Sequence, residues 1–261
     1  MQRCNLFGFA FSSDAIRTRS WYCCILAVIL FGHSTRTIAQ STDEKPPTID
    51  EALWNTLEGS EPWPTELIEV GELPDPDDSI APLIKTGNIE FKFYDANKIR
   101  RRFTGETRMA MKYYTDVKFR WRLVRAAGKR QLTVTVEHRP TRFETYHQIL
   151  LPREHAHAQM YSVPLVLHEL DHVRIVIDPR YQAQFEEWFQ EDTKSLTIEL
   201  DSRTKESEFN ALIQAEIQAK SVPCFEKVLQ LIQIRNRELD RRTQHGRVPL
   251  DEKFFGSDED R

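Results

Sequence analysis

The sequence has few cysteines, few glycines and no long apolar run. Only four of its 261 residues are cysteine and only nine are glycine, and Cys4, Cys23 and Cys24 all lie near the start. So few of either residue argues against a disulfide-rich scaffold and against a collagen-like chain. The longest nearly apolar run, residues 21–31, would span about 16 Å as a helix, roughly half of a bilayer core. The composition therefore excludes a multi-pass membrane protein.

The first 39 residues are predicted to be a signal peptide. Residues 1–20 carry three arginines against one acid, and the apolar run follows them directly. Thr37 and Ala39 are small residues at the positions that precede a cleavage site. We therefore expect cleavage near Ala39 and export to the periplasm or the extracellular space. An uncleaved N-terminal anchor and a start codon further along the chain are the alternatives.

Removal of this segment changes the net charge and the cysteine content of the chain. Without residues 1–39, 32 basic and 39 acidic residues remain, so the net charge changes from −4 to −7. Cys224 becomes the only cysteine, which rules out an internal disulfide. We interpret Cys224 as a small core residue. The mature chain should contain no membrane span, and it must be stabilised by a hydrophobic core, with or without a metal.

Composition divides the mature chain into three parts. Residues 40–86 hold seven of the 13 prolines and twelve acids against two lysines, which is typical of a leader or linker. In residues 87–250 the apolar residues show the alternation of strands and the spacing of helices, as in a folded domain. Residues 251–261 form an acidic tail. No internal repeat is present.

The folded region is predicted to be α+β. Strand-like alternation and helical spacing favour an antiparallel sheet, then a helix that contains an HExxH motif, then C-terminal helices. The predicted strands are 89–94, 116–123, 131–138, 142–151 and 196–200. The main predicted helices are 164–177, with a restart at 180–190, then 206–220 and 223–244, the last two separated at Ser221-Val222-Pro223.

A basic stretch runs along residues 91–142, with 15 Lys and Arg against 4 acids. Lys118, Arg120 and Arg122 alternate with Phe119 and Trp121, so the bases and the aromatic rings fall on opposite faces of a strand. A nucleic-acid surface would present both on one face. We therefore interpret the bases as a solvated sheet face. Export also disfavours nucleic acid as a partner, and anionic polymers of the cell envelope remain open.

The motif that carries chemistry is His168-Glu169-Leu170-Asp171-His172, inside an apolar helical segment. Two histidines four apart project from the same face of a helix and can share one Zn²⁺. Glu169 lies beside such an ion, where it can act as general base and then general acid toward a water molecule. Asp171 is a candidate for orienting one of the two histidines.

A catalytic zinc ion normally has three protein ligands, and the sequence offers several residues for the third position. His245 follows the last predicted helix. Glu191 lies 19 residues after His172, with Asp192 next to it. His155 and His157 precede the motif helix.

One resemblance favours His245 among these. The HExxH motif together with Asp240, Thr243, His245 and Gly246, in the pattern D-x-x-T-x-H-G, resembles a family of bacterial domains of unknown function that are predicted to be secreted zinc-dependent proteases. The resemblance covers roughly residues 89–255. It implies a zincin-like fold, Zn²⁺ as cofactor and His245 as the third ligand beside His168 and His172.

The sequence therefore predicts an exported zinc metallopeptidase that acts on protein or peptide substrates, with Glu169 as its catalytic residue. A zinc amidase acting on wall peptides fits the same motifs. The alternative from another class is a non-catalytic cell-envelope binding module whose metal site is vestigial or structural. The substrate preference, the oxyanion-stabilising residue and the oligomeric state stay open.

Overall fold

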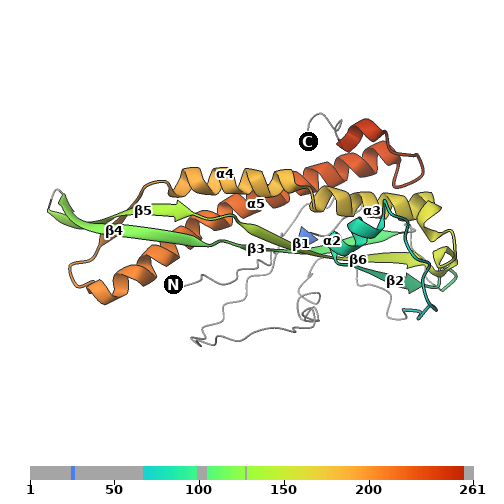
Figure 1. Ribbon diagram of the computed structural model, residues 1–261, viewed down its shortest axis with the longest axis horizontal. Coiled ribbons are helices and arrows are strands. Elements are labelled where there is room, and N and C mark those ends of the chain that lie inside the picture. The colour runs from blue at the N-terminus through green and yellow to red at the C-terminus, as the bar shows by residue number, and fades with distance from the viewer. Residues whose placement is uncertain (1–24, 27–66, 99–104, 127, 256–261) are drawn as a thin grey trace. The chain divides into compact units, whose positions relative to one another are not determined.

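The computed structural model describes residues 25–26, 67–98, 105–126 and 128–255, and it is α+β, as the sequence predicts (Figure 1). The strands are β1 Ile25–Leu26, β2 Ile89–Tyr94, β3 Glu106–Tyr114, β4 Val117–Ala126, β5 Lys129–His138, β6 Arg142–Pro152 and β7 Leu196–Leu200. The α-helices are α2 Ala81–Gly87, α3 Pro164–Val176, α4 Pro179–Thr193 and α5 Phe209–Thr243. The 3-10 turns are η1 Arg153–His155, η2 Met160–Ser162, η3 Glu206–Glu208 and η4 Glu252–Phe255. The expected signal-peptide cleavage site and most of the expected leader lie outside the described residues.

The described chain forms two compact units. The hairpin unit consists of residues 113–143 and 178–231. The motif unit consists of the described residues up to 112, together with 144–177 and 232–255. The region from 87 to 250, which the sequence suggests is one domain, is thus shared between two units, and the chain passes from one to the other within β3, β6 and α5.

The hairpin unit confirms the predicted antiparallel hairpin. Its sheet has the order β4-β5-β7, with both pairs antiparallel, and Phe119 lies opposite Val136. Gly128 has φ +78° in the turn between β4 and β5, a left-handed conformation that glycine adopts without a steric penalty. Trp121 packs edge-on against Phe209 of α5, with 5.2 Å between ring centroids. The aromatic face of β4 is therefore the covered face, as the alternation indicates.

Helix α5 corrects the prediction of two C-terminal helices. It runs unbroken from Phe209 to Thr243 with Pro223 inside it. A proline inside a helix removes its own N–H donor, and its ring crowds the carbonyl group four residues earlier. The hydroxyl of Ser221 donates to the Gln218 carbonyl, and the thiol of Cys224 lies within hydrogen-bond distance of the Lys220 carbonyl, so side chains contact the backbone around the proline. Buried apolar residues before and after Pro223 keep the helix in place.

The motif unit is built on the sheet β1-β3-β6-β2. β2 and β6 pair in parallel, with Phe91 opposite Ile149, so the expectation of a wholly antiparallel sheet is wrong here. A parallel pair needs a long connection, and about 50 residues separate these two strands. β3 was not among the predicted strands. Thr107 to Met111 are all buried, so no alternation marks this part of the strand.

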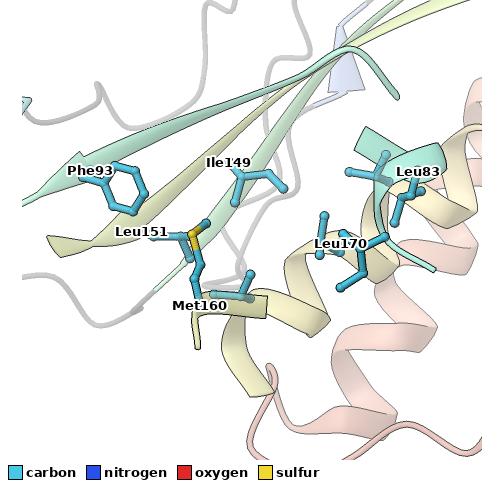
Figure 2. Close-up of a cluster of buried hydrophobic side chains, with 9 residues drawn as sticks. Leu83, Phe93, Ile149, Leu151, Met160 and Leu170 are labelled. Atoms are coloured by element: carbon cyan, nitrogen blue, oxygen red, sulfur yellow. The ribbon is translucent and has the colours of Figure 1, made fainter. Parts of the chain in front are cut away.

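One face of this sheet packs against α3 to form the core of the motif unit. Figure 2 shows its labelled side chains converging from five elements: Leu83 of α2, Phe93 of β2, Ile149 and Leu151 of β6, Met160 of η2 and Leu170 of α3. Each is at most 7% exposed. This core places the buried face of α3 against the sheet and so fixes the position of the motif helix.

The motif unit also includes residues that composition assigns to the leader. Asp77 accepts hydrogen bonds from the backbone N–H groups of Ser79 and Ile80 just before α2. Leu67 forms an antiparallel bridge with Tyr94 at the outer edge of β2. The folded part therefore begins before residue 87, because a few apolar residues among the acids dock on the core. Among the described residues, no helix has both the length and the apolarity needed to cross a bilayer.

Candidate metal centre

The HExxH motif lies on α3, close to the predicted helix 164–177. Pro164 occupies the first turn, where its missing N–H costs no hydrogen bond, and Pro179 follows the helix end. His168 and His172 project from the same face, with 4.7 Å between their ring centroids, and both are buried. The geometry that the spacing predicts for these two side chains is therefore present.

The third member of the centre is Asp240 of α5. Its Oδ1 atom lies 3.3 Å from His168 Nε2 and 3.2 Å from His172 Nε2. One ligand atom from each of the three residues lies within 4.8 Å of the others. Two imidazole nitrogens and one carboxylate oxygen thus converge on a volume of the size that one metal ion needs.

Helix α5 also supplies hydrogen-bond partners to the Nδ1 atoms of both histidines. Asn236 Oδ1 lies 3.0 Å from His172 Nδ1, and an amide oxygen only accepts, so this Nδ1 carries the proton. The Thr243 hydroxyl donates to the Leu239 carbonyl at 2.9 Å and lies 3.1 Å from His168 Nδ1, so it accepts from that nitrogen as well. With both Nδ1 atoms paired in this way, Nε2 of each histidine is the nitrogen that faces Asp240 and that a metal ion would bind in place of a proton. Such hydrogen-bond partners are usual around metal-binding histidines.

The chain turns sharply just after α5. Gln244, His245 and Gly246 have φ values of 50°, 58° and 78°, three left-handed residues in a row. The N–H of His245 donates to the Asp240 carbonyl at 3.0 Å, which ends the helix. A Cβ atom on Gly246 would lie 3.0 Å from the His168 Cβ. Glycine is needed there both for its φ angle and for the close approach to the histidine.

Glu169 is held by the start of β3. Its Oε2 atom accepts a hydrogen bond from the Thr107 hydroxyl at 2.6 Å, and both side chains are buried. A Cβ atom on Gly105 would lie 2.6 Å from Glu169 Oε1, so any other residue here would force the carboxylate to shift. The carboxylate is thus clamped on one oxygen and closely bounded on the other.

The electrostatics of the centre suit a cation. Burial opposes a charge on His172, but the Asp240 carboxylate, Glu169 and Asn236 together raise the pKa of His172 to about 9. Burial would likewise raise the pKa of Asp240, but hydrogen bonds with His168 and His172 hold it well below its usual range. In the metal-free chain, a proton on His172 therefore provides the positive charge that a metal ion would replace.

His245, the expected third ligand, lies beside this group. Its Nδ1 atom is 3.5 Å from Asp240 Oδ1, and its side chain is 45% exposed. The compact set of ligand atoms contains Asp240 where the sequence suggests His245. The segment that carries the resemblance thus contributes Asp240 to this group, and His245, which lies beyond the helix end, is not in it.

The other candidate ligands lie elsewhere. Glu191 is exposed on α4 in the hairpin unit, and its neighbour Asp192 lies 3.6 Å from the thiol of Cys224. His155 ends η1, and His157 follows two residues later, where its Nδ1 accepts from the Gln159 N–H. In the described part of the chain, none of these four residues belongs to a three-residue metal-binding group.

Asp171 has a different role from the expected one. Its carboxylate accepts a hydrogen bond from Arg174 at 2.7 Å, whereas Asn236 and Thr243 orient the histidines.

Sequence reasoning missed Asn236 and Thr107. Asn236 was detectable, because it lies four residues before Asp240 and so shares its helix face. Thr107 was not, because its strand had no recognisable pattern.

Comparison with protein-family models finds no matching family, and comparisons with curated proteins and with solved structures find no match either.

Proposed function

We propose that this protein is a zinc-dependent metallopeptidase with a zincin-like catalytic unit. The observation that carries the proposal is the convergence of His168 Nε2, His172 Nε2 and Asp240 Oδ1 on one volume, with the Glu169 carboxylate next along α3. Three protein ligands leave a fourth position open, which separates catalytic from structural zinc sites.

The residues fit zinc by their chemistry. Imidazole nitrogen and carboxylate oxygen are both common zinc ligands, and the tautomers fixed by Asn236 and Thr243 present the correct nitrogen of each histidine. When bound, the zinc ion would supply a Lewis acid that lowers the pKa of water and polarises a carbonyl group. Two histidines and one carboxylate also suit iron(II), but a buried glutamate beside the ligands favours hydrolysis.

In this proposal Glu169 moves the protons. It accepts a proton from the attacking water and delivers it to the leaving nitrogen as the peptide bond breaks. The hydrogen bond from Thr107 fixes one oxygen of the carboxylate, so the other oxygen is presented for proton transfer in a constant position. Burial keeps this pair away from competing bulk water.

We further propose that the protein is exported after cleavage near Ala39, and that it acts on proteins or peptides outside the cytoplasm. The support is the basic start, the short apolar run and the small residues before the expected cleavage site. An amidase acting on wall peptides would use the same groups, because both reactions hydrolyse an amide bond.

One observation favours the second candidate, a non-catalytic envelope-binding module. Lys118, Arg120 and Arg122 are exposed on β4, and none of them forms an ion pair with another described residue. β4 is an edge strand, and exposed charges on such strands commonly prevent unwanted strand pairing. We therefore rank binding to anionic polymers second.

The test compares zinc content with hydrolysis in one set of variants. Glu169→Gln should keep about one zinc per chain and lose about 10²–10⁴-fold in the hydrolysis of unfolded casein. Glu191→Gln, a change at an exposed glutamate of the hairpin unit, should alter neither property. Full casein hydrolysis by Glu169→Gln would refute the mechanism, and zinc-loaded wild-type protein without any amide hydrolysis would favour the binding module.

A further inference from the structure

β4 is a long edge strand of the hairpin unit, and its outer backbone is open. Within the sheet β4-β5-β7 it pairs with β5 alone, from Val117 to Ala126, and every residue of the strand has a partner in turn, so the pairing has no bulge (Figure 1). Among the described residues, no backbone hydrogen bond from another segment reaches the other edge of β4. The N–H and C=O groups that point away from β5 are therefore able to pair with a further strand.

The charges on β4 are its main protection against unwanted pairing. Natural edge strands are commonly protected by short length, by proline, by bulges or by charged side chains. β4 has 10 residues, contains no proline and pairs without a bulge, so of these devices it has the charges. Charges of one sign repel strands of the same sign and attract strands of the opposite sign. This edge is therefore closed to basic strands and open to acidic ones.

The solvent-facing side of β4 is basic. Lys118, Arg120 and Arg122 are exposed on it, and none of them forms an ion pair with another described residue. On β5, Glu137 lies directly opposite Lys118, but both arginines lie opposite threonines. No acid of β5 is therefore directly opposite either arginine, and their two positive charges face outward together.

The opposite side of β4 is apolar. Phe119 and Trp121 are half-buried there, and Leu123 is 41% exposed. Trp121 packs against Phe209 of α5, so this helix lies on the same side of the strand. Successive side chains of an added strand would point alternately to the basic side and to the apolar side. The sequence that fits this edge therefore alternates acidic and apolar residues.

A second copy of this chain does not fit the edge. Antiparallel pairing of two β4 strands centred on Arg120 would place Arg120 opposite itself and Lys118 opposite Arg122. Registers centred one residue to either side would still place two of these bases opposite each other. Like charges directly opposite each other destabilise a strand pair. The same bases that oppose self-pairing favour an acidic partner.

We propose that β4 binds an extended acidic peptide segment of another protein, which adds to the sheet β4-β5-β7 as a further strand beside β4. The backbone of the peptide pairs with the open edge, its carboxylates lie beside Arg120 and Arg122, and its apolar side chains extend the side that carries Trp121 and Leu123. An anionic polysaccharide would neutralise the bases but would use neither the open backbone nor the apolar side. This binding surface lies in the hairpin unit and does not depend on the proposed peptidase activity.

The test measures binding of a fluorescein-labelled peptide to the full chain. The peptide has about ten residues, to match β4, and alternates glutamate and valine. Wild-type protein should bind it with a Kd below about 1 mM. Arg120→Glu/Arg122→Glu should bind it at least about 10-fold more weakly, because two attractive cross-strand pairs become repulsive. This variant should bind the matching lysine–valine peptide more tightly than wild type does.

The control variant is Lys194→Glu/Arg203→Glu. It makes the same change in net charge at exposed residues that flank β7, the strand at the other edge of the sheet. Its affinity for the glutamate–valine peptide should stay within about twofold of wild type, because salt screens charges that are far from the peptide. An equal loss in both variants would show attraction by net charge alone and would overturn the proposal.

Backbone pairing is tested separately from charge. The same peptide with methylated backbone nitrogens keeps its carboxylates but cannot donate hydrogen bonds to β4, so it should bind at least about 10-fold more weakly. Binding of the unmethylated peptide should also protect the alternate β4 amides that point away from β5 from hydrogen exchange. Equal binding of the methylated peptide, or binding without new protection, would make the surface a general anion site and overturn strand addition. Unchanged affinity in Arg120→Glu/Arg122→Glu, or a wild-type dimer whose dissociation constant this variant alters, would also overturn it.

Discussion

The clamp between Thr107 and Glu169 gives a sharp prediction for Thr107→Val. Valine has nearly the same shape but no hydroxyl, so the change removes the 2.6 Å hydrogen bond to a buried carboxylate, together with the 3.2 Å contact of the same hydroxyl with the Glu169 backbone carbonyl. A hydrogen bond to a charged group contributes about 1.5–3 kcal/mol, and we expect the free energy of unfolding to fall by that amount. Urea denaturation of the metal-free protein measures it.

The same change should also slow catalysis. Without the clamp the Glu169 carboxylate can leave the position from which it takes a proton, and misplacement by about 1 Å can cost about 10²-fold. We expect kcat on casein to fall about 10–100-fold, with the zinc content unchanged because no ligand is altered. Thr107→Ser keeps the hydroxyl and should retain most of the activity.

Gly105→Ala tests the other oxygen of the same carboxylate. Its new Cβ would lie 2.6 Å from Glu169 Oε1, so the carboxylate must move. We expect a loss of kcat similar to that of Thr107→Val. If Thr107→Val kept both full stability and full kcat, the clamp would have no role and the reasoning from buried geometry to proton transfer would be refuted.

The remaining predictions concern the residues around the metal centre, the turn after α5 and the thiol of Cys224. Because His172 has a pKa of about 9 in the metal-free chain, zinc binding at pH 7 should release about one proton, and the affinity should weaken as the pH falls below 9; calorimetry in buffers of different ionisation enthalpy measures both. The same shift stabilises the metal-free fold fully below about pH 6.5, and this stability should be lost as the pH rises through 9, which urea titrations would detect. Asn236→Ala should weaken zinc binding about 10–100-fold in chelator competition, whereas unchanged affinity would mean that Asn236 does not orient His172. Gly246→Ala should lower the free energy of unfolding by about 1–2 kcal/mol, because alanine is strained at φ +78° and crowds His168. Cys224 should resist thiol reagents in the native protein, because burial raises the pKa of its thiol to about 11.

Local patterns in the sequence predicted much of this fold. The hairpin from Val117 to His138 alternates cleanly and was predicted nearly in full, because one face is covered and the other is solvated. β3 was missed because five residues in succession, from Thr107 to Met111, are buried, and such a run carries no periodicity. The parallel pairing of β2 with β6 depends on tertiary contacts between distant segments, which no local pattern specifies.

The residues of the candidate site were likewise only partly predictable from local patterns. His168, Glu169 and His172 follow from one helix and its spacing. Asp240 belongs to the D-x-x-T-x-H-G pattern, but its place beside the two histidines depends on where α5 ends and how the next residues turn. The left-handed conformation of His245 places its imidazole beside Asp240, and this backbone geometry has no signature in a single sequence.

The most direct test of the central claim is a crystal structure of the zinc-loaded protein with anomalous data collected at the zinc edge. We predict one zinc peak, within about 2.0–2.2 Å of His168 Nε2, His172 Nε2 and an Asp240 oxygen, with no bond to His245. No peak at this position, or a peak coordinated by His245 in place of Asp240, would contradict the account.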